Sequence, residues 1–219
     1  MSDGIAEGQV GTLGAGYAAT TSHGLMLDRS GALVVMDFYL KAMLDGRGYQ
    51  VRAGTITTPL VGDVAITDTA AEFCIDPPAG YTCLPVYQNI STRLGTGTLL
   101  EYATKSVATA SSSGTAFVPL PLLPGSTACG TTARVAASGG VTVTAELATT
   151  TRRHWSVSQP IAMGAYVLPG EWTPRNPPPI KSTATTAWCL FTQIAATTTG
   201  PSYYANLDFL EFVTAQLGI

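Results

Sequence analysis

Apolar and polar residues alternate along much of this chain, and the alternation predicts β-strands. In the range 141–147, valine, alanine and leucine alternate with threonine and glutamate, which is the period of a half-buried strand. In the range 188–194 both phases carry apolar residues, so both faces of that strand are expected to be covered. The apolar phase changes within 203–213, after Phe209, which predicts a bulge or a strand buried on both faces.

Shorter patterns of the same kind extend the prediction to most of the chain. Further candidate strands are 49–57, 64–67, 70–75, 82–90, 99–107 and 134–136. Threonine is abundant and suits a pleated surface, while most prolines fall between the candidate strands or at their edges. About eight to ten short strands separated by turns predict an all-β fold, either a two-sheet sandwich or a barrel.

One segment, 33–44, has a helical period instead. Its apolar stripe consists of Val35, Phe38, Tyr39 and Ala42. Gly46 and Gly48 lie where a helix end is expected, and Asp37 and Lys41 are spaced to form an ion pair on the outer face. We therefore expect one short N-terminal helix in a single domain spanning 26–219. The Gly/Ala/Thr-rich range 1–25 has no periodicity and is expected to be an extended assembly arm, without a signal peptide.

The amino-acid composition narrows the classes of function that the chain can have. Charged residues make up 11% of the 219 residues and hydrophobic residues 46%, against about 25% charged in an average soluble domain. A chain with so few charges is expected to have much of its surface in contact with other protein molecules. The net charge of −3 gives no attraction to nucleic acid or to an anionic membrane, and no apolar run reaches the roughly 20 residues of a membrane span.

The residues that usually carry catalysis are scarce. His23 and His154 are the two histidines, and no G-x-S-x-G motif presents a serine nucleophile. Asp208 and Glu211 can act as a glycosidase pair only if a bulge brings them to one face. Asp63 and Asp68 lie close enough in the sequence to be candidate oxygen ligands for calcium, but the residues around them do not form a calcium-loop motif. We expect no enzyme activity, no cofactor and no metal.

Two further groups of residues bear on function. The four cysteines form no C-x-x-C pair; Cys74 and Cys83 flank a turn and can pair across a hairpin, although buried thiols are the favoured interpretation. The four cysteines are Cys74, Cys83, Cys129 and Cys189. The second group is Arg152, Arg153, Trp155 and Trp172, candidates for subunit contacts or for stacking on a glycan.

Three stretches carry a resemblance to a known class of protein. They are Asp37 to Ala42, Gly46 to Tyr49 and Gly54 to Pro59, which together give a short helix, a G-R turn and a strand ending in T-T-P. This arrangement resembles structural proteins of environmental tailed phages and related viruses. The final strand, 203–213, is similar to the closing strand of viral jelly rolls. The resemblance covers about a third of the chain and its motifs are structural.

The resemblance implies a jelly-roll β-sandwich that serves as a capsid, vertex or decoration subunit of a virion. Its expected partners are copies of itself and other virion proteins, and it would be made in the host cytoplasm. The arm has no lysine or arginine before Arg29, so direct genome binding is not expected. The alternative is a carbohydrate- or receptor-binding β-sandwich module.

Overall fold

The computed structural model describes residues 37–96, 99–136, 140–146, 149–160, 166–171 and 179–217. Within these ranges the chain is mostly β-structure, with an α-helix at the start and a 3-10 helix at the end. The helices are α1 (Phe38–Leu44) and η2 (Thr214–Leu217). The strands are β1 (Gly48–Ala53), β2 (Leu60–Val61), β3 (Ala70–Ala71), β4 (Phe73–Asp76), β5 (Tyr81–Thr96), β6 (Leu99–Val107), β7 (Ser112–Ser113), β8 (Thr115–Phe117), β9 (Leu120–Pro121), β10 (Thr132–Val135), β11 (Val141–Thr142), β12 (Thr151–Pro160), β13 (Tyr166–Glu171), β14 (Ile180–Lys181), β15 (Cys189–Ala196) and β16 (Thr199–Val213). The expected arm, 1–25, lies outside the described residues.

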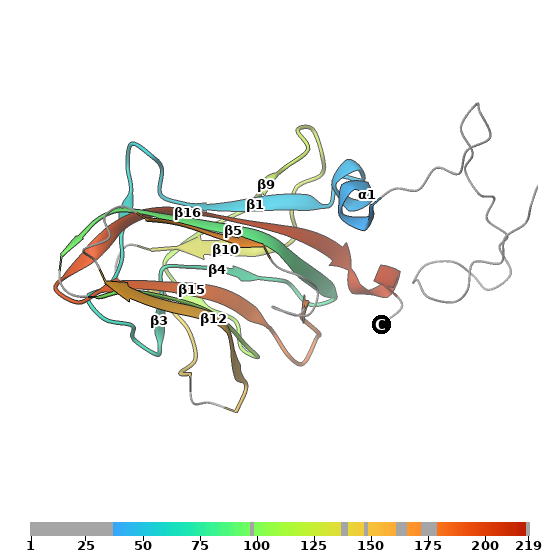
Figure 1. Cartoon of the computed structure of the whole chain (residues 1–219). Helices are drawn as coiled ribbons and strands as arrows, with labels where there is room; N and C mark the ends of the chain where they lie inside the picture. The colour runs from blue at the N-terminus through green and yellow to red at the C-terminus, as the bar shows by residue number, and fades with distance from the viewer. Residues whose placement is uncertain are drawn as a thin grey trace, which may run out of the picture.

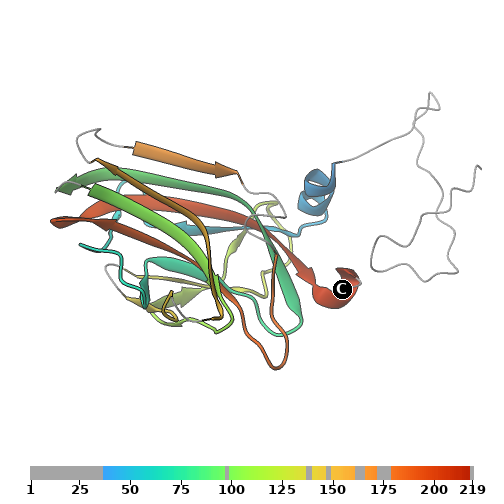
Figure 2. The same cartoon turned by 60° about the horizontal axis from the view of Figure 1, so that its bottom comes forward.

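Two antiparallel sheets stack face to face to form a β-sandwich. Among the described strands, the first sheet has the order β13-β5-β16-β1-β9, with β14 beside β5 and β2 beside β16. The second sheet has the order β12-β6-β15-β4-β10-β8. Figure 1 shows the first sheet as the upper layer and the second as the lower layer. Figure 2 shows β13, in orange, lying beside β5.

The order of the long strands is that of a jelly roll. In chain order, β1, β5, β13 and β16 belong to the first sheet, whereas β4, β6, β12 and β15 belong to the second. Their spatial orders are β13-β5-β16-β1 and β12-β6-β15-β4, so the first and last long strands, β1 and β16, lie side by side in one sheet. This is the eight-stranded double Greek key expected from the sequence.

The main core lies between the two sheets. Alternate residues of β16 point into it, and Tyr203 and Phe209 are fully buried there. A polar group also bridges the sheets: the Gln88 amide donates to the Thr192 hydroxyl at 3.1 Å and accepts from the Thr104 hydroxyl at 3.2 Å. These three side chains satisfy one another, so they can stay buried at little cost.

The change of phase in the last strand comes from burial on both faces. Leu210 on the outer face of β16 is covered by α1, so the explanation by two covered faces is confirmed. A bulge does lie beside this point, but in the neighbouring strand: Asp208 lies opposite Tyr87 and Phe209 opposite Pro85, so Val86 bulges out of β5 and β16 itself alternates regularly there. The bulge falls at a proline, which has no N–H to give to the ladder.

Helix α1 covers the outer face of the first sheet, as Figure 1 shows. Asp37 caps its start by accepting from the Tyr39 N–H at 2.9 Å, and Gly46 ends it with φ of +73°. The expected Asp37–Lys41 ion pair is wrong, because Asp37 faces the backbone and Lys41 pairs with Asp45 at 2.7 Å instead.

Two predicted strands differ from the structure. In 141–147 only Val141–Thr142 is a strand; it joins β3 and β7 in a small sheet over the outer face of the second sheet. The chain then turns, and Glu146 pairs with Lys105 on β6. Residues 64–67 form no strand, because the Thr67 carbonyl accepts from the Gln193 side chain at 2.5 Å instead of joining a ladder.

The strand predicted over 49–57, ending in T-T-P, is confirmed only as far as Ala53, because Gly54, with φ of +69°, begins a loop that lasts to Pro59. The other strand predictions in the described ranges are confirmed. β1, β4, β5, β6, β10, β15 and β16 fall on the expected segments, and all eight residues of β15 are buried, as the two-phase apolar pattern indicates. No helix in the described ranges is long and apolar enough to cross a membrane.

Candidate functional site

The first candidate site is the run Arg152 to Trp155 on β12, at the edge of the second sheet. A register shift between Arg153 and Trp155 makes His154 a bulge, so successive side chains leave the strand in different directions. Arg152 is exposed, and its guanidinium carbon lies 5.3 Å from the centre of the Trp188 ring. This cation–π contact holds the arginine along the surface of its own subunit.

Of the two tryptophans predicted for glycan stacking, Trp155 lies within the described residues and is not presented for stacking. Trp155 is half-buried, packs against the main core and has its ring 6.3 Å from that of Tyr102. A ring with one face against the core offers little surface for a sugar. Trp172 lies outside the described residues.

Arg153, whose side chain is 54% exposed, is the outer member of an ion network that reaches the buried Lys105. Glu146 pairs with Arg153 and also accepts from Lys105, whose side chain is 1% exposed, at 2.6 Å. Burial lowers the pKa of Lys105, and the nearby Asp68 carboxylate opposes that shift. A buried charge must be paired, so this network ties β6 and β12 to the loop that carries Glu146.

His154 and Ser106 form the one pairing that resembles a nucleophile and its base. The Ser106 hydroxyl lies 2.6 Å from His154 Nε2, and Ser106 is buried. Burial, with a smaller contribution from the Arg152 charge, lowers the pKa of His154 to about 4. A general base should have a pKa near the working pH, so this histidine is poorly suited to activate the serine.

Asp208 and Glu211 lie on opposite faces of β16 and do not flank a common space. Glu211 points into the sandwich and accepts from the Gly130 N–H at 2.8 Å and the Thr131 N–H at 2.6 Å. Asp208 points outward and accepts from the Gln50 amide at 2.8 Å. The bulge that would have reunited them lies in β5, so the alternation of β16 is unchanged.

A shallow cleft of about 430 Å³ lies beside β3 and β11. Its lining residues are Asp63, Val64, Ala65, Thr67, Thr69, Ala70 and Thr142. Asp68, the other candidate calcium ligand, is exposed and is not part of the lining. Within the described ranges, Asp63 and Asp68 join no group of three metal-binding side chains.

The buried Glu72 carboxylate lies near this cleft, directly before β4 in the second sheet. It accepts from the Ile194 N–H at 2.7 Å, where β4 no longer pairs with β15. Burial raises the pKa of Glu72 well above its usual value, and the Asp63 carboxylate raises it further. The Glu72 side chain thus supplies the acceptor that a strand carbonyl would otherwise give to the Ile194 N–H, which is a structural role.

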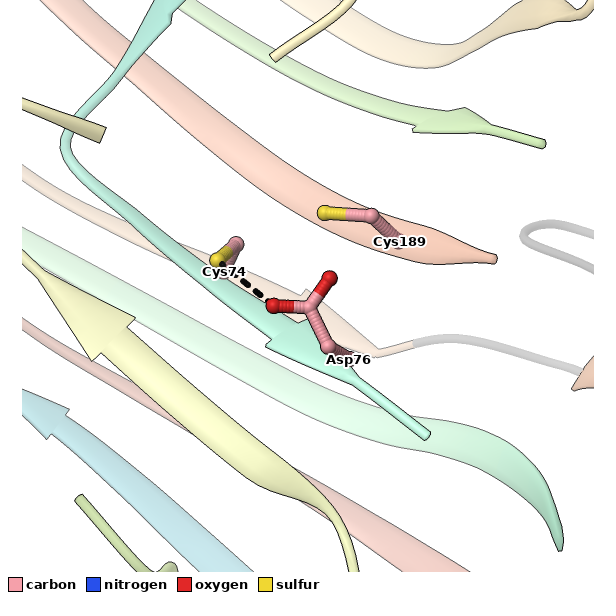
Figure 3. A group of neighbouring side chains, drawn as sticks. All are labelled: Cys74, Asp76 and Cys189. Atoms are coloured by element: carbon pink, nitrogen blue, oxygen red, sulfur yellow. Dashed lines mark hydrogen bonds between the residues drawn. The ribbon is translucent and has the colours of Figure 1, made fainter. Parts of the chain in front are cut away.

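A second group of side chains, here called the cysteine cluster, lies on the outer face of the second sheet. It consists of Cys74 and Asp76 on β4 and Cys189 on β15, and Figure 3 shows them converging. Their Sγ and carboxylate atoms all lie within 4.8 Å of one another. Burial raises the pKa of Cys189 well above its usual value, and the neighbouring Cys74 thiol adds to the shift.

Sequence reasoning missed this cluster. All four cysteines are free and buried, as the favoured interpretation predicted, but Cys74 lies on the outer face of its sheet and Cys83 in the main core. Cys74 and Asp76 are two apart on one strand, which is a visible signal of a shared face. The arrival of Cys189 depends on strand order, which no local pattern contains.

The third feature is an apolar patch on the outer face of the first sheet. It comprises Phe38, Leu40 and Leu44 of α1 and Leu120 and Leu123 at and after β9, which are 38–54% exposed. The two halves meet where the side chains of Met43 and Leu122 lie together over Gly48. Exposed apolar side chains gathered on neighbouring elements mark an interaction site more often than isolated apolar residues do.

Comparisons with known proteins do not assign any of these features. No protein-family model matches the chain, and neither the curated proteins nor the solved structures give a match.

Proposed function

We propose that this chain is a non-enzymatic structural subunit of a virus particle, either of the capsid or of an outer decoration layer. It assembles with copies of itself and with other virion proteins. The apolar patch carries the proposal, because it is the described surface that most needs a protein partner. Copies of this chain are its proposed occupant.

The strand order supports the proposal by analogy. Jelly rolls of this order form many viral capsid subunits, but they also occur in lectins and cupins. Two observations within the described residues favour the structural use over sugar binding and catalysis. Trp155 is packed against the core, and Ser106 and His154 are poorly matched for catalysis.

The chemistry of the patch supports a protein partner over a small ligand. Leu40 and Leu44 are four residues apart on α1, so they form one ridge beside the residues that face the sheet. Both are more than half exposed. A ridge of this kind fits a groove on another protein, where its burial contributes about 1.5–3 kcal/mol per side chain.

The proposal is tested by measuring assembly of the purified full chain. Sedimentation velocity and negative-stain electron microscopy should show closed or regular multimers whose population rises with protein concentration. Leu44→Glu should disperse them, because a carboxylate in the apolar contact has no partner. Circular dichroism should show that the variant keeps its β-structure.

The matched control is Ile56→Glu. Ile56 is 64% exposed and lies in the loop between β1 and β2, at the opposite end of the first sheet from α1 in Figure 1. This variant should assemble like the wild type. A wild-type chain that stays monomeric at high concentration would contradict the proposal, and equal loss in both variants would contradict the role of the patch.

A further inference from the structure

The cysteine cluster does not depend on the proposed function and needs its own account. Cys74 and Cys189 are both fully buried, on neighbouring strands, under the small sheet formed by β3, β11 and β7. Asp76 completes a triangle with them and is 13% exposed, so the cluster reaches solvent on one side. Three metal-binding side chains from two strands thus face one point beneath the surface (Figure 3).

A disulfide does not explain the pair of cysteines. Cys74 lies directly opposite Phe191 in the antiparallel ladder, so Cys189 is offset from it by two residues. Diagonal neighbours of this kind are roughly 7 Å apart, whereas a disulfide needs Cβ atoms about 3.5–4.5 Å apart. Forming the bond would require the two strands to shift against each other.

The spacing does suit a tetrahedral metal ion. The Cys74 thiol donates to Asp76 Oδ2 at 3.7 Å, and this separation is also ordinary for two ligands of one ion. With zinc bonds of about 2.3 Å to sulfur and 2.0–2.2 Å to oxygen, the edge between such ligands is roughly 3.6 Å. The three side chains leave a fourth position on the ion. The Ser111 hydroxyl, 3.0 Å from Cys74 Sγ, lies close enough to fill it.

The surroundings hold the carboxylate in place. The Ser111 N–H donates to Asp76 Oδ1 at 2.9 Å, and the Ser111 hydroxyl donates to Oδ2 at 2.5 Å. Ligating carboxylates are commonly hydrogen-bonded in this way. Arg134 Nε lies 3.8 Å from Asp76 Oδ2. Two thiolates and one carboxylate around a divalent ion leave a single negative charge, which the arginine balances.

We propose that Cys74, Asp76 and Cys189 bind a thiophilic divalent metal ion of the zinc class. Each thiol gives up its proton to solvent when the ion binds, so binding releases protons and weakens as the pH falls. The bound ion ties β4 to β15 and, through Ser111, to the segment before β7. With protein ligands on three or four sides, the site is structural.

The experiment is a titration of the reduced full chain with Co²⁺, followed by displacement with Zn²⁺. We expect one equivalent of Co²⁺ per chain, a thiolate-to-cobalt charge-transfer band in the near ultraviolet and loss of that band on adding Zn²⁺. Ser111→Ala should weaken binding by roughly 10–100-fold, because it removes the hydroxyl that holds Asp76 Oδ2 and leaves only the backbone N–H on Oδ1.

The matched pair of variants is Cys189→Ser and Cys129→Ser. Both remove one buried thiol, but Cys129 lies beside Glu211 and away from the cluster. Cys189→Ser should abolish the charge-transfer band and Cys129→Ser should keep it. If Cys189→Ser fails to fold, Asp76→Asn should lower the affinity in its place.

Several results would overturn the proposal. They are a wild-type chain that binds no Co²⁺, a cobalt spectrum without a thiolate band, and an equal loss of the band in Cys129→Ser. A Cys74–Cys189 disulfide found by mass spectrometry in the purified chain would also overturn it. Failure of the virion proposal would leave these results unaffected, because none of them depends on assembly.

Discussion

Glu211 is expected to be the most costly carboxylate to remove from this chain. It is 7% exposed and accepts from two backbone N–H groups, those of Gly130 and Thr131, in the segment that leads into β10. These two contacts join the last strand of the first sheet to the second sheet. Asp208, three residues earlier on the outer face, makes its contact with the half-buried Gln50.

The expected magnitudes follow from this geometry. A hydrogen bond to a charged group contributes about 1.5–3 kcal/mol, and a buried donor left without a partner costs about as much. Glu211→Ala removes both acceptors and should lower the free energy of unfolding by about 3–5 kcal/mol. Glu211→Gln keeps one acceptor oxygen, so it should cost about 1.5–3 kcal/mol. Asp208→Asn should cost less than about 1 kcal/mol.

Urea unfolding at pH 7, followed by tryptophan fluorescence and circular dichroism, measures these differences. Each variant should be unfolded at two protein concentrations, because self-association would make the midpoint depend on concentration. If Glu211→Gln stayed within about 0.5 kcal/mol of the wild type, Glu211 would not join the two sheets. If Asp208→Asn cost as much as Glu211→Gln, the assignment of the two faces would be wrong.

Two further outcomes are expected. Phe209→Ala should cost about 3–5 kcal/mol in the same assay, because Phe209 is fully buried against Tyr49; a nearly silent substitution would show that β16 is peripheral. His154 should make the fold less stable in acid: its folded pKa of about 4 lies below the ordinary value, so the unfolded chain takes up a proton first as the pH falls from about 6.5. Because His154 is only half-buried, the loss by pH 4 should be about 1–2 kcal/mol relative to His154→Gln, and equal acid sensitivity in both would contradict it.

Local sequence patterns predicted the strands that have one or both faces covered by apolar residues. β15 and β16 were predictable because their alternation records which faces are covered, and α1 because its period is 3.6. β12 was not predicted as a strand, since its Arg152-Arg153-His154 run places charge on both phases. Ordinary alternation sends Arg152 to Trp188 and Arg153 to Glu146, and the bulge at His154 lets Trp155 pack against the main core.

The cysteine cluster shows where local patterns stop being informative. The face shared by Cys74 and Asp76 follows from the two-residue period of a strand. The contact with Cys189 follows only from β15 lying beside β4, which is a property of the jelly-roll order. The failed prediction of a strand over 141–147 has a similar origin. The contact that turns the chain there, between Glu146 and Lys105, joins residues distant in the sequence.

The distribution of charge sharpens the proposal about assembly. Charged residues are already scarce at 11% of the chain, yet Glu72, Lys105 and Glu211 are buried inside the fold. Each has a structural partner there, so the surface is left with even fewer charges than the composition indicates. Few surface charges mean weak repulsion between copies. Contacts through Leu40 and Leu44 would then depend on buried apolar area, and salt should do little to disperse them.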